Sequence, residues 1–344
     1  MSQIWTPTRA AGLSALADFA PQMGRAYASG RNTDAGWDRQ STSRLSPWLR
    51  HRLISEHEVL EVAASQGGYD ACEKFVQEVF WRGYFKGWLE QRPFIWTRYL
   101  EARATAATQL SKDRNLRARY EAAIEGRTGI ECFDHWAQEL VTKGWLHNHA
   151  RMWMASIWIF TLRLPWPLGA DWFLTHLVDG DPASNTLSWR WVAGLHTRGK
   201  FYLADAENIR RFTDGRFHPK GQLSDVAEMP DDPDVEPAQP LPAADEMPPK
   251  NAGWLLLSED LAGDHGTAPV LALPADTPRG LAETGAVAAS FEPGALADAA
   301  TRCDAVMAPE WSADAVRDWM RDSGVTNLAV WAVPQGPQAD RLST

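Results

Sequence analysis

A run rich in proline and acid divides this chain into two parts of different character. Residues 224–250 contain the stretch MPDDPDVEPAQPLPAADEMPPK, which has few large apolar side chains. Such a segment buries too little apolar surface to offset the entropy that it would lose on ordering. We therefore expect a linker at 224–250, although a proline-rich surface loop would have the same composition. The chain must then build its fold from two parts, residues 1–223 and 251–344.

The first part is predicted to be mainly α-helical. Its apolar residues recur at helical spacing, and no alternating strand pattern or internal repeat occurs. Gly144 stands where a glycine would end a helix, and Asp181-Pro182 has the form of an N-cap followed by proline at the first helical position. The predicted helices cover residues 71–89, 132–143, 148–164, 170–178 and 182–193.

The second part is predicted to be a small α/β unit with parallel strands. Short apolar runs predict strands at 254–257, 270–273, 287–290 and 328–333, and a helix at 313–323 lies between strands. The unit has no GxGxxG or Walker motif, so the sequence shows no loop that would cradle a phosphate.

Charge is distributed unevenly along the chain. The net charge of −10 combines 28 basic and 23 acidic residues in 1–220 with 6 basic and 21 acidic residues in 221–344. The first part, at +5, is compatible with a nucleic-acid partner, whereas the second part, at −15, would repel one. The acidic second part remains a candidate surface for a protein partner.

The cysteines and the apolar runs indicate a cytoplasmic protein. Cys72, Cys132 and Cys303 are too far apart for a disulfide framework, which fits a reducing compartment. The longest apolar run, Trp153–Leu164, is too short to span a bilayer. We see no signal peptide and expect no membrane partner. The 18 tryptophans require a large helical core, stacking platforms or a redox role, and core packing should account for most of them.

Two motifs before residue 90 are candidates for binding. Thr42-Ser43-Arg44-Leu45-Ser46 offers hydroxyl and amide donors for a diphosphate, although a hydroxyl-rich helix cap explains it equally well. Glu78 and Trp81 share a helix face, and Arg82 is one turn from Glu78. The pattern indicates either a helical salt bridge beside a core tryptophan or an acid and an aromatic ring on one wall of a cavity.

Two further motifs lie between residues 144 and 191. Asn148, Arg151 and Met152 occupy one helical stripe, which is a poor core former unless something polar lies there. His147 and His149 would diverge on a helix, so we expect no metal site.

In the second of these motifs, Asn185 and Trp189 are one turn apart, whereas Trp191 lies about 200° around the helix at 100° per residue. That helix would therefore present Asn185 and Trp189 on its inward face and Trp191 on a different face.

Together these motifs resemble the FAD-binding domain of DNA photolyases and cryptochromes over residues 30–220. The stretches TSRLSPWL, TGIECFDHWAQELVTKGWLHNHARM and LVDGDPASNTLSWRW carry the resemblance. It implies an all-helical FAD-binding domain followed here by the small α/β domain. Photolyases usually begin with an α/β antenna domain, which is missing here, so an antenna chromophore is not supported. The α/β unit is either a shortened, relocated antenna-like domain or an unrelated addition.

The resemblance also implies a FAD site. Asn185 matches the position that faces the flavin ring, where an amide donates or accepts a hydrogen bond without adding negative charge. Arg151 and Asp179 match the ion pair near that ring. The remaining residues that match FAD contacts are Thr42, Ser43, Leu45 and Ser46 for the diphosphate, Arg44 as its brace, and Trp145, Asn148 and Asp181.

A substrate site and an electron route follow from the same resemblance. A flipped pyrimidine dimer in damaged DNA would contact Glu78, Trp81, Met152 and Trp191. Trp189 and Trp166 match the first two members of the electron-transfer chain of the family, and the third has no clear counterpart, although Trp96 is near. The implied function is light-driven repair of a pyrimidine dimer, and the alternative is a cryptochrome-like sensor or FAD-binding module without repair activity.

Overall fold

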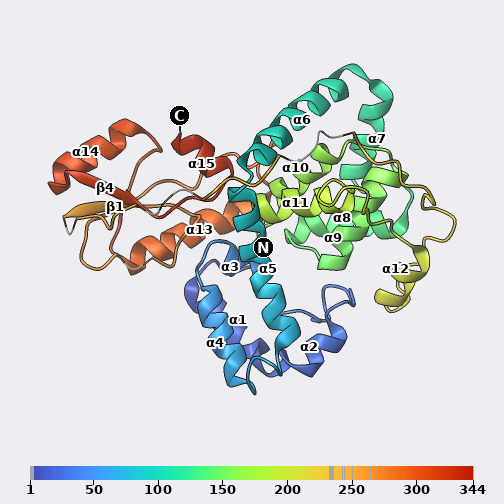
Figure 1. Ribbon diagram of the computed structural model, residues 1–344, viewed down its shortest axis with the longest axis horizontal. Helices are drawn as coiled ribbons and strands as arrows, with labels where there is room; N and C mark the ends of the chain where they lie inside the picture. The colour runs from blue at the N-terminus through green and yellow to red at the C-terminus, as the bar shows by residue number, and fades with distance from the viewer. Residues whose placement is uncertain are drawn as a thin grey trace.

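The computed structural model describes residues 4–231, 236–241, 243, 245–249, 251–263 and 265–343. Helices dominate up to residue 212, and a small sheet with flanking helices follows residue 251 (Figure 1). The first group of helices is α1 (Arg9–Phe19), α2 (Arg25–Gly30), α3 (Ser46–Arg50), α4 (Glu56–Ser65), α5 (Glu73–Glu90) and α6 (Pro93–Lys112). The second group is α7 (Arg114–Ile124), α8 (Glu131–Lys143), α9 (Asn148–Ser156), α10 (Trp166–His176), α11 (Pro182–Val192) and α12 (Ala206–Phe212).

Local signals explain where these helices begin and end. Asp181 caps α11 by accepting a hydrogen bond from the Ser184 amide at 2.7 Å, and α8 ends at Gly144 in the left-handed conformation, as predicted. The predicted helix at 148–164 is α9 followed by a π-helical turn at Ile157–Thr161. The helix predicted at 170–178 begins four residues earlier, because proline is tolerated in the first turn of α10.

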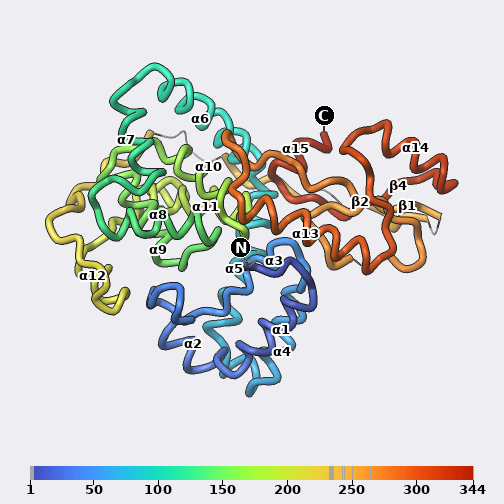
Figure 2. Tube along the Cα trace, turned by 180° about the vertical axis from the view of Figure 1, so that it is seen from behind, coloured from blue at the N-terminus to red at the C-terminus, as the bar shows by residue number. Residues whose placement is uncertain are grey.

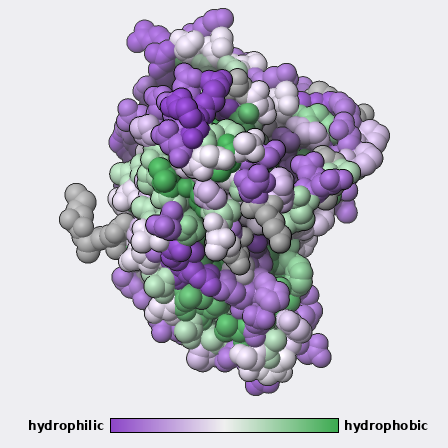
Figure 3. All heavy atoms as spheres, turned by 90° about the vertical axis from the view of Figure 1, so that its left-hand side faces the viewer, coloured by the Kyte–Doolittle hydropathy of each residue, from purple (hydrophilic) through white to green (hydrophobic). Residues whose placement is uncertain are grey.

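The C-terminal unit contains a four-stranded parallel sheet in the order β3-β2-β1-β4. Its elements are β1 (Ala252–Leu256), β2 (Val270–Ala272), α13 (Ala286–Arg302), β3 (Val306–Met307), α14 (Ala313–Ser323), β4 (Asn327–Val330) and α15 (Pro337–Leu342). Figure 3 looks onto the side that holds this unit in Figure 1, where hydrophilic and hydrophobic residues are interspersed.

One predicted strand is wrong. Residues 287–290 lie in α13, whose buried residues Ala288, Phe291, Ala295 and Ala299 follow helical spacing. A short apolar run cannot be assigned to strand or helix by periodicity alone, and Pro293 inside α13 disguised the longer pattern. The parallel arrangement and the helix at 313–323 are confirmed.

The two parts of the chain share a hydrophobic core. One cluster joins Trp48 and Leu49 of the N-terminal helices to Leu256, Val270 and Phe291 of the C-terminal unit. In the reverse view of Figure 2, α13 lies beside α3, and Trp48 of α3 contacts Phe291 of α13 at 6.3 Å between ring centroids. Trp96 of α6 donates to Asp340 of α15 at 2.9 Å. The boundaries at 223 and 251 stay a prediction, but the C-terminal unit packs directly on the helices that precede the linker.

A second and larger hydrophobic cluster is built from residues of α6 to α11, with Leu89 of α5 and further members from the segment that ends at Phe217. Eleven of the 18 tryptophans are buried, so core packing accounts for most of them, as expected. Within the described ranges, no helix combines the length and the apolar character needed to cross a membrane.

Candidate flavin-binding cavity

A cavity of about 610 Å³ opens between α5, α9 and α11. Its wall includes predicted cofactor and predicted substrate residues together, which is the convergence that the sequence implied. Those residues are Glu78, Trp81, Asn148, Arg151, Met152, Asp179, Asp181, Asn185, Trp189 and Trp191.

An ion pair at the cavity wall joins α9 to the turn between α10 and α11. Arg151 Nη2 lies 2.9 Å from Asp179 Oδ2, and Arg151 Nε donates to the Leu146 carbonyl at 3.0 Å. The second bond prevents the guanidinium from rotating freely, so the pair has a fixed orientation. The side chain of Asp179 is 4% exposed and that of Arg151 is 25% exposed, so the pair is only partly shielded from solvent.

The side chain of Asn185 is fixed by a hydrogen bond to α10. Its side-chain amide donates to the carbonyl of Ala170 at 2.8 Å, which connects α11 to α10. The side chain also lines the cavity and is 8% exposed. A fixed amide of this kind presents a neutral polar group to a ligand without a charge of its own.

Asp181 carries a negative charge at the N-terminus of α11. Burial alone would raise the pKa of this carboxyl, but the positive charges of Lys86, Arg50 and Arg82 outweigh burial and hold the pKa below its usual range. Lys86 Nζ lies 3.5 Å from Asp181 Oδ2. Asp181 is therefore ionised at neutral pH, both as a helix cap and as a cavity residue.

The mouth of the cavity is aromatic and exposed. Trp81 is 47% and Trp191 38% exposed. Trp191 stacks on Tyr202 at 5.8 Å between ring centroids, and Trp81 contacts Tyr84 at 5.1 Å. Trp191 was predicted to face away from Asn185, yet both line the same cavity because α11 ends at its rim. Large exposed rings at a cavity mouth are suited to stacking against a flat ligand.

Glu78 does not form the helical salt bridge that its spacing allowed. Its carboxylate pairs instead with Arg31, the residue that follows α2, while Nε and Nη2 of Arg82 are buried without a hydrogen-bond partner. Met152 accepts a weak contact from the Asn148 amide at 3.8 Å. Arg82 is a cavity residue that the sequence reasoning did not assign; its position one turn from Glu78 was the available signal.

The predicted diphosphate loop lies at a second, much smaller hollow. Thr42 and Arg44 line it together with Trp145 and Glu139. Arg44 has a left-handed backbone, φ 53°, and its guanidinium lies 4.5 Å from the Trp37 ring centroid.

The other three residues of the loop, Ser43, Leu45 and Ser46, are not among those that line this hollow. Ser43 Oγ accepts a weak bond from the Leu45 amide at 3.4 Å, Leu45 is buried, and Ser46 Oγ accepts from Trp145 Nε1 at 3.1 Å. The structure therefore brings the loop against Trp145 but not into the wall of the larger cavity.

The polar groups at the two hollows suit a dinucleotide that carries a diphosphate. Buried polar atoms without partners are costly, and two of the arginines here have them: Nε of Arg44 and Nε and Nη2 of Arg82. Guanidinium groups are well matched to phosphate oxygens. The residues present fit the cofactor, since an anionic ligand would satisfy these donors while a flat ring enters the larger cavity.

The histidines predicted to diverge do not. His147 is the N-cap of α9 and not part of the helix, so its ring comes within 5.7 Å of the His149 ring. Burial lowers the pKa of His147 to about 4, which keeps that ring neutral. Over the described residues, no group of three or more His, Cys, Asp or Glu side chains is arranged to hold a metal ion.

The aromatic routes that leave the cavity differ from the predicted order. Trp189 contacts Phe173 at 5.0 Å and Trp158 at 6.2 Å, and Trp158 stacks on Trp172 at 5.8 Å. Trp166, the predicted second member, contacts a different ring, that of Tyr99 at 5.8 Å.

Tyr99 in turn contacts Trp96 at 5.2 Å. The structure thus contains two runs of adjacent rings, one from Trp189 through Trp158 and one from Trp166 to Trp96. Trp158 was not singled out by the sequence reasoning because no local motif marks it.

Comparisons with known proteins find similarity in the helical part. Residues 75–221 match the model of the FAD-binding domain of DNA photolyase. The chain is 34% identical to deoxyribodipyrimidine photo-lyase of Streptomyces griseus, over 59% of this chain and 43% of that protein, and 30% identical to the same enzyme of Agrobacterium fabrum, over 61% and 46%. A class III photolyase structure from Agrobacterium tumefaciens aligns with a TM-score of 0.50 and 29% identity, over 61% and 46% of the two chains. The chain thus spans less than half the length of these relatives.

Proposed function

Because the chain belongs to the photolyase/cryptochrome family through its FAD-binding domain, we propose that it repairs pyrimidine dimers in DNA under light. One observation carries this proposal: a single cavity joins five of the predicted cofactor residues to an exposed aromatic mouth. These five are Asn148, Arg151, Asp179, Asp181 and Asn185. Reduced FAD, when bound, supplies the electron that splits the dimer. The protein supplies binding, orientation and the electrostatic setting for that chemistry.

The floor of the cavity orients the flavin in this proposal. Arg151 and Asp179 form a fixed ion pair beside the ring, and Asn185 faces it with an amide anchored to α10. Neither arrangement adds net charge, so the floor does not oppose negative charge on the ring. Arg82 beside this cavity and Arg44 beside the smaller hollow have unpartnered donors, and these are the candidates to bind the diphosphate.

The mouth accepts the flipped lesion. Trp81 and Trp191 offer ring faces for stacking, and each stacked base contributes about 1–3 kcal/mol in nucleic-acid complexes. Met152 lines the same cavity. Flipping costs less for a dimer than for an intact base pair, because the lesion already stacks poorly.

A second candidate function is light sensing without repair. Glu78, which would hydrogen-bond the dimer, is engaged with Arg31, so a lesion would have to displace that pair. The net charge of −15 in residues 221–344 also favours a protein partner over DNA for that part of the chain.

Repair of a defined oligonucleotide tests the proposal. The full-length protein with FAD and reductant is illuminated with blue light in the presence of a thymine-dimer oligonucleotide, and recovery of absorbance at 260 nm is followed. Trp81→Ala and Trp191→Ala should bind and repair the dimer poorly while retaining FAD. Trp331→Ala is the matched control, since Trp331 is also 38% exposed but lies in the C-terminal unit. Wild-type protein that holds FAD but leaves the dimer intact would instead support the sensor function.

A further inference from the structure

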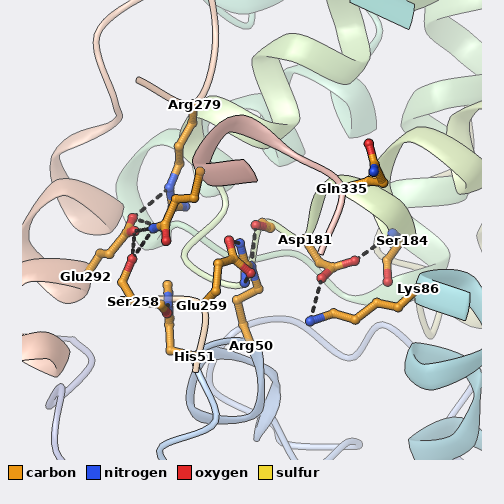
Figure 4. A network of polar contacts seen from close by, with 12 residues as sticks. Arg50, His51, Lys86, Asp181, Ser184, Ser258, Glu259, Arg279, Glu292 and Gln335 are labelled. Atoms are coloured by element: carbon orange, nitrogen blue, oxygen red, sulfur yellow. Dashed lines mark hydrogen bonds and ion pairs between the residues drawn. The ribbon is translucent and has the colours of Figure 1, made fainter. Parts of the chain in front are cut away.

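The C-terminal unit reaches the flavin cavity through a chain of buried polar contacts (Figure 4). Arg50, the last residue of α3, is 5% exposed. Its Nη1 and Nη2 bind the two carboxylate oxygens of Glu259, while its Nε donates to the Gly180 carbonyl at 2.8 Å. One guanidinium therefore joins the C-terminal unit to a turn of the helical part.

That turn carries cavity residues on both sides of Gly180. Asp179 precedes it and pairs with Arg151, and Asp181 follows it and caps α11. The turn is tight, because a Cβ on Gly180 would lie 2.9 Å from the Leu177 carbonyl oxygen. A small shift of the Gly180 carbonyl would therefore move both carboxylates.

A second arginine holds the start of the same turn. Arg279 Nη1 donates to the Leu177 carbonyl at 2.8 Å, and its Nη2 pairs with Glu292 Oε2 at 2.6 Å. Both Glu292 and Arg279 belong to the C-terminal unit, and both are buried. Two arginines, each paired with a carboxylate of the C-terminal unit, thus bind the carbonyl groups of Leu177 and Gly180 in this turn.

The C-terminal residues that make these contacts include two that follow a strand of the parallel sheet. Ser258 and Glu259 follow β1, an inner strand between β2 and β4, at the carboxyl edge of the sheet. Doubly wound sheets usually bind ligands at this edge, where the strand order reverses. Here His51 Nδ1 lies 2.7 Å from the Ser258 carbonyl oxygen, and Gln338 bonds the Ser258 hydroxyl. The edge is filled by side chains from the helical part and from α15, so it serves as a docking surface.

We propose that Glu259 is a positioning residue of the flavin site, acting through Arg50 on the turn that carries Asp179 and Asp181. The inference rests on the flavin-binding part of the proposed function and not on DNA repair. The acidic C-terminal unit is then a structural component of the cofactor site.

The test measures FAD affinity in full-length variants. Glu259→Gln retains the size of the side chain but leaves the charge of Arg50 without its partner. We expect the dissociation constant for FAD, followed by flavin fluorescence, to rise roughly 3- to 30-fold, in the range of couplings transmitted through such contacts. Hydrogen exchange of the 177–184 peptide should accelerate in parallel. Glu283→Gln, an exposed acid in the same unit, is the matched control and should change neither quantity.

A second variant separates positioning from loss of folding. The double substitution Arg50→Met with Glu259→Met replaces a buried ion pair by apolar groups, a change that proteins often tolerate without loss of stability. It still removes the donor to Gly180, so FAD binding should weaken as in Glu259→Gln while the melting temperature is retained. Unchanged FAD affinity in a folded double variant would overturn the proposal. A wild-type protein that binds no FAD would instead refute the flavin assignment itself.

Discussion

Gly169 allows the cavity tryptophan Trp189 to pack against Trp158, and substitution to alanine should break that contact. A Cβ at position 169 would lie 2.3 Å from Cη2 of Trp189 and 2.9 Å from Cε2 of Trp158. Carbon atoms in favourable contact are about 3.5–4.0 Å apart, so one indole must move by more than 1 Å, roughly, in a core where both rings are buried.

The expected magnitude follows from two opposing effects. Overpacking a core costs about 1–3 kcal/mol, and this clash is at the severe end. Alanine is favoured over glycine inside a helix by about 1 kcal/mol, which offsets part of the cost. We expect Gly169→Ala to lower the free energy of unfolding by about 1–2 kcal/mol in urea denaturation followed by circular dichroism. Photoreduction of the bound flavin should also slow, because Trp189 is displaced from its neighbour.

Gly87→Ala is the matched control for this substitution. Gly87 lies inside α5, and no atom lies within 4 Å of a Cβ built there. This variant gains helix propensity without a clash, so its free energy of unfolding should rise by about 0.5–1 kcal/mol. If Gly169→Ala proved as stable as Gly87→Ala, with unchanged photoreduction, the packing argument would be wrong.

Two further predictions concern Glu139 and the aromatic routes. Burial, and then the charge of Asp34, raise the pKa of Glu139 to about 7, so the folded state holds a proton that the unfolded state releases near pH 4.5. The free energy of unfolding should therefore fall as pH rises from about 4.5 to 7. Glu139→Gln should flatten this part of the profile of melting temperature against pH. A profile that falls equally in both proteins would assign the effect elsewhere. Trp158→Phe and Trp166→Phe distinguish the two ring runs: transient absorption should show slower flavin photoreduction for whichever substitution interrupts the route in use, and equal rates in both variants and wild type would exclude both routes.

The helices that the sequence predicted well are those with complete local signals. Residues 313–323 form α14 with the predicted bounds, because Ser312 caps its start and Gly324 adopts the left-handed conformation at its end. The start of α11 at Pro182 was equally clear. By contrast, α13 was missed because its proline and small residues conceal the helical period, and β3 is too short to leave a pattern.

Some features of the candidate site could be predicted from the sequence and others could not. Arg151, Asp179 and Asn185 were expected to surround one hollow, and they line one cavity. The partner of Glu78 was not predictable, since Arg31 lies 47 residues away and only tertiary packing brings the two together. Spacing along one helix favoured Arg82 instead, which shows that a helical pair is a weak expectation when another element packs against the same face.

Composition predicted a linker at 224–250 but could not say whether the parts on either side of it are independent. The excess of acid after residue 221 predicted that this part would repel a nucleic acid, and its packing on the helical part was not predicted. Yet Glu259 of that unit is buried against Arg50, and Phe291 packs against Trp48 in a shared core. A net charge averages over exposed and buried groups, whereas an interface depends on a few carboxylates placed opposite arginines. The acidic composition of the C-terminal unit is therefore compatible with tight packing on the more basic helical part, and that packing is what brings Glu259 within reach of the cavity wall.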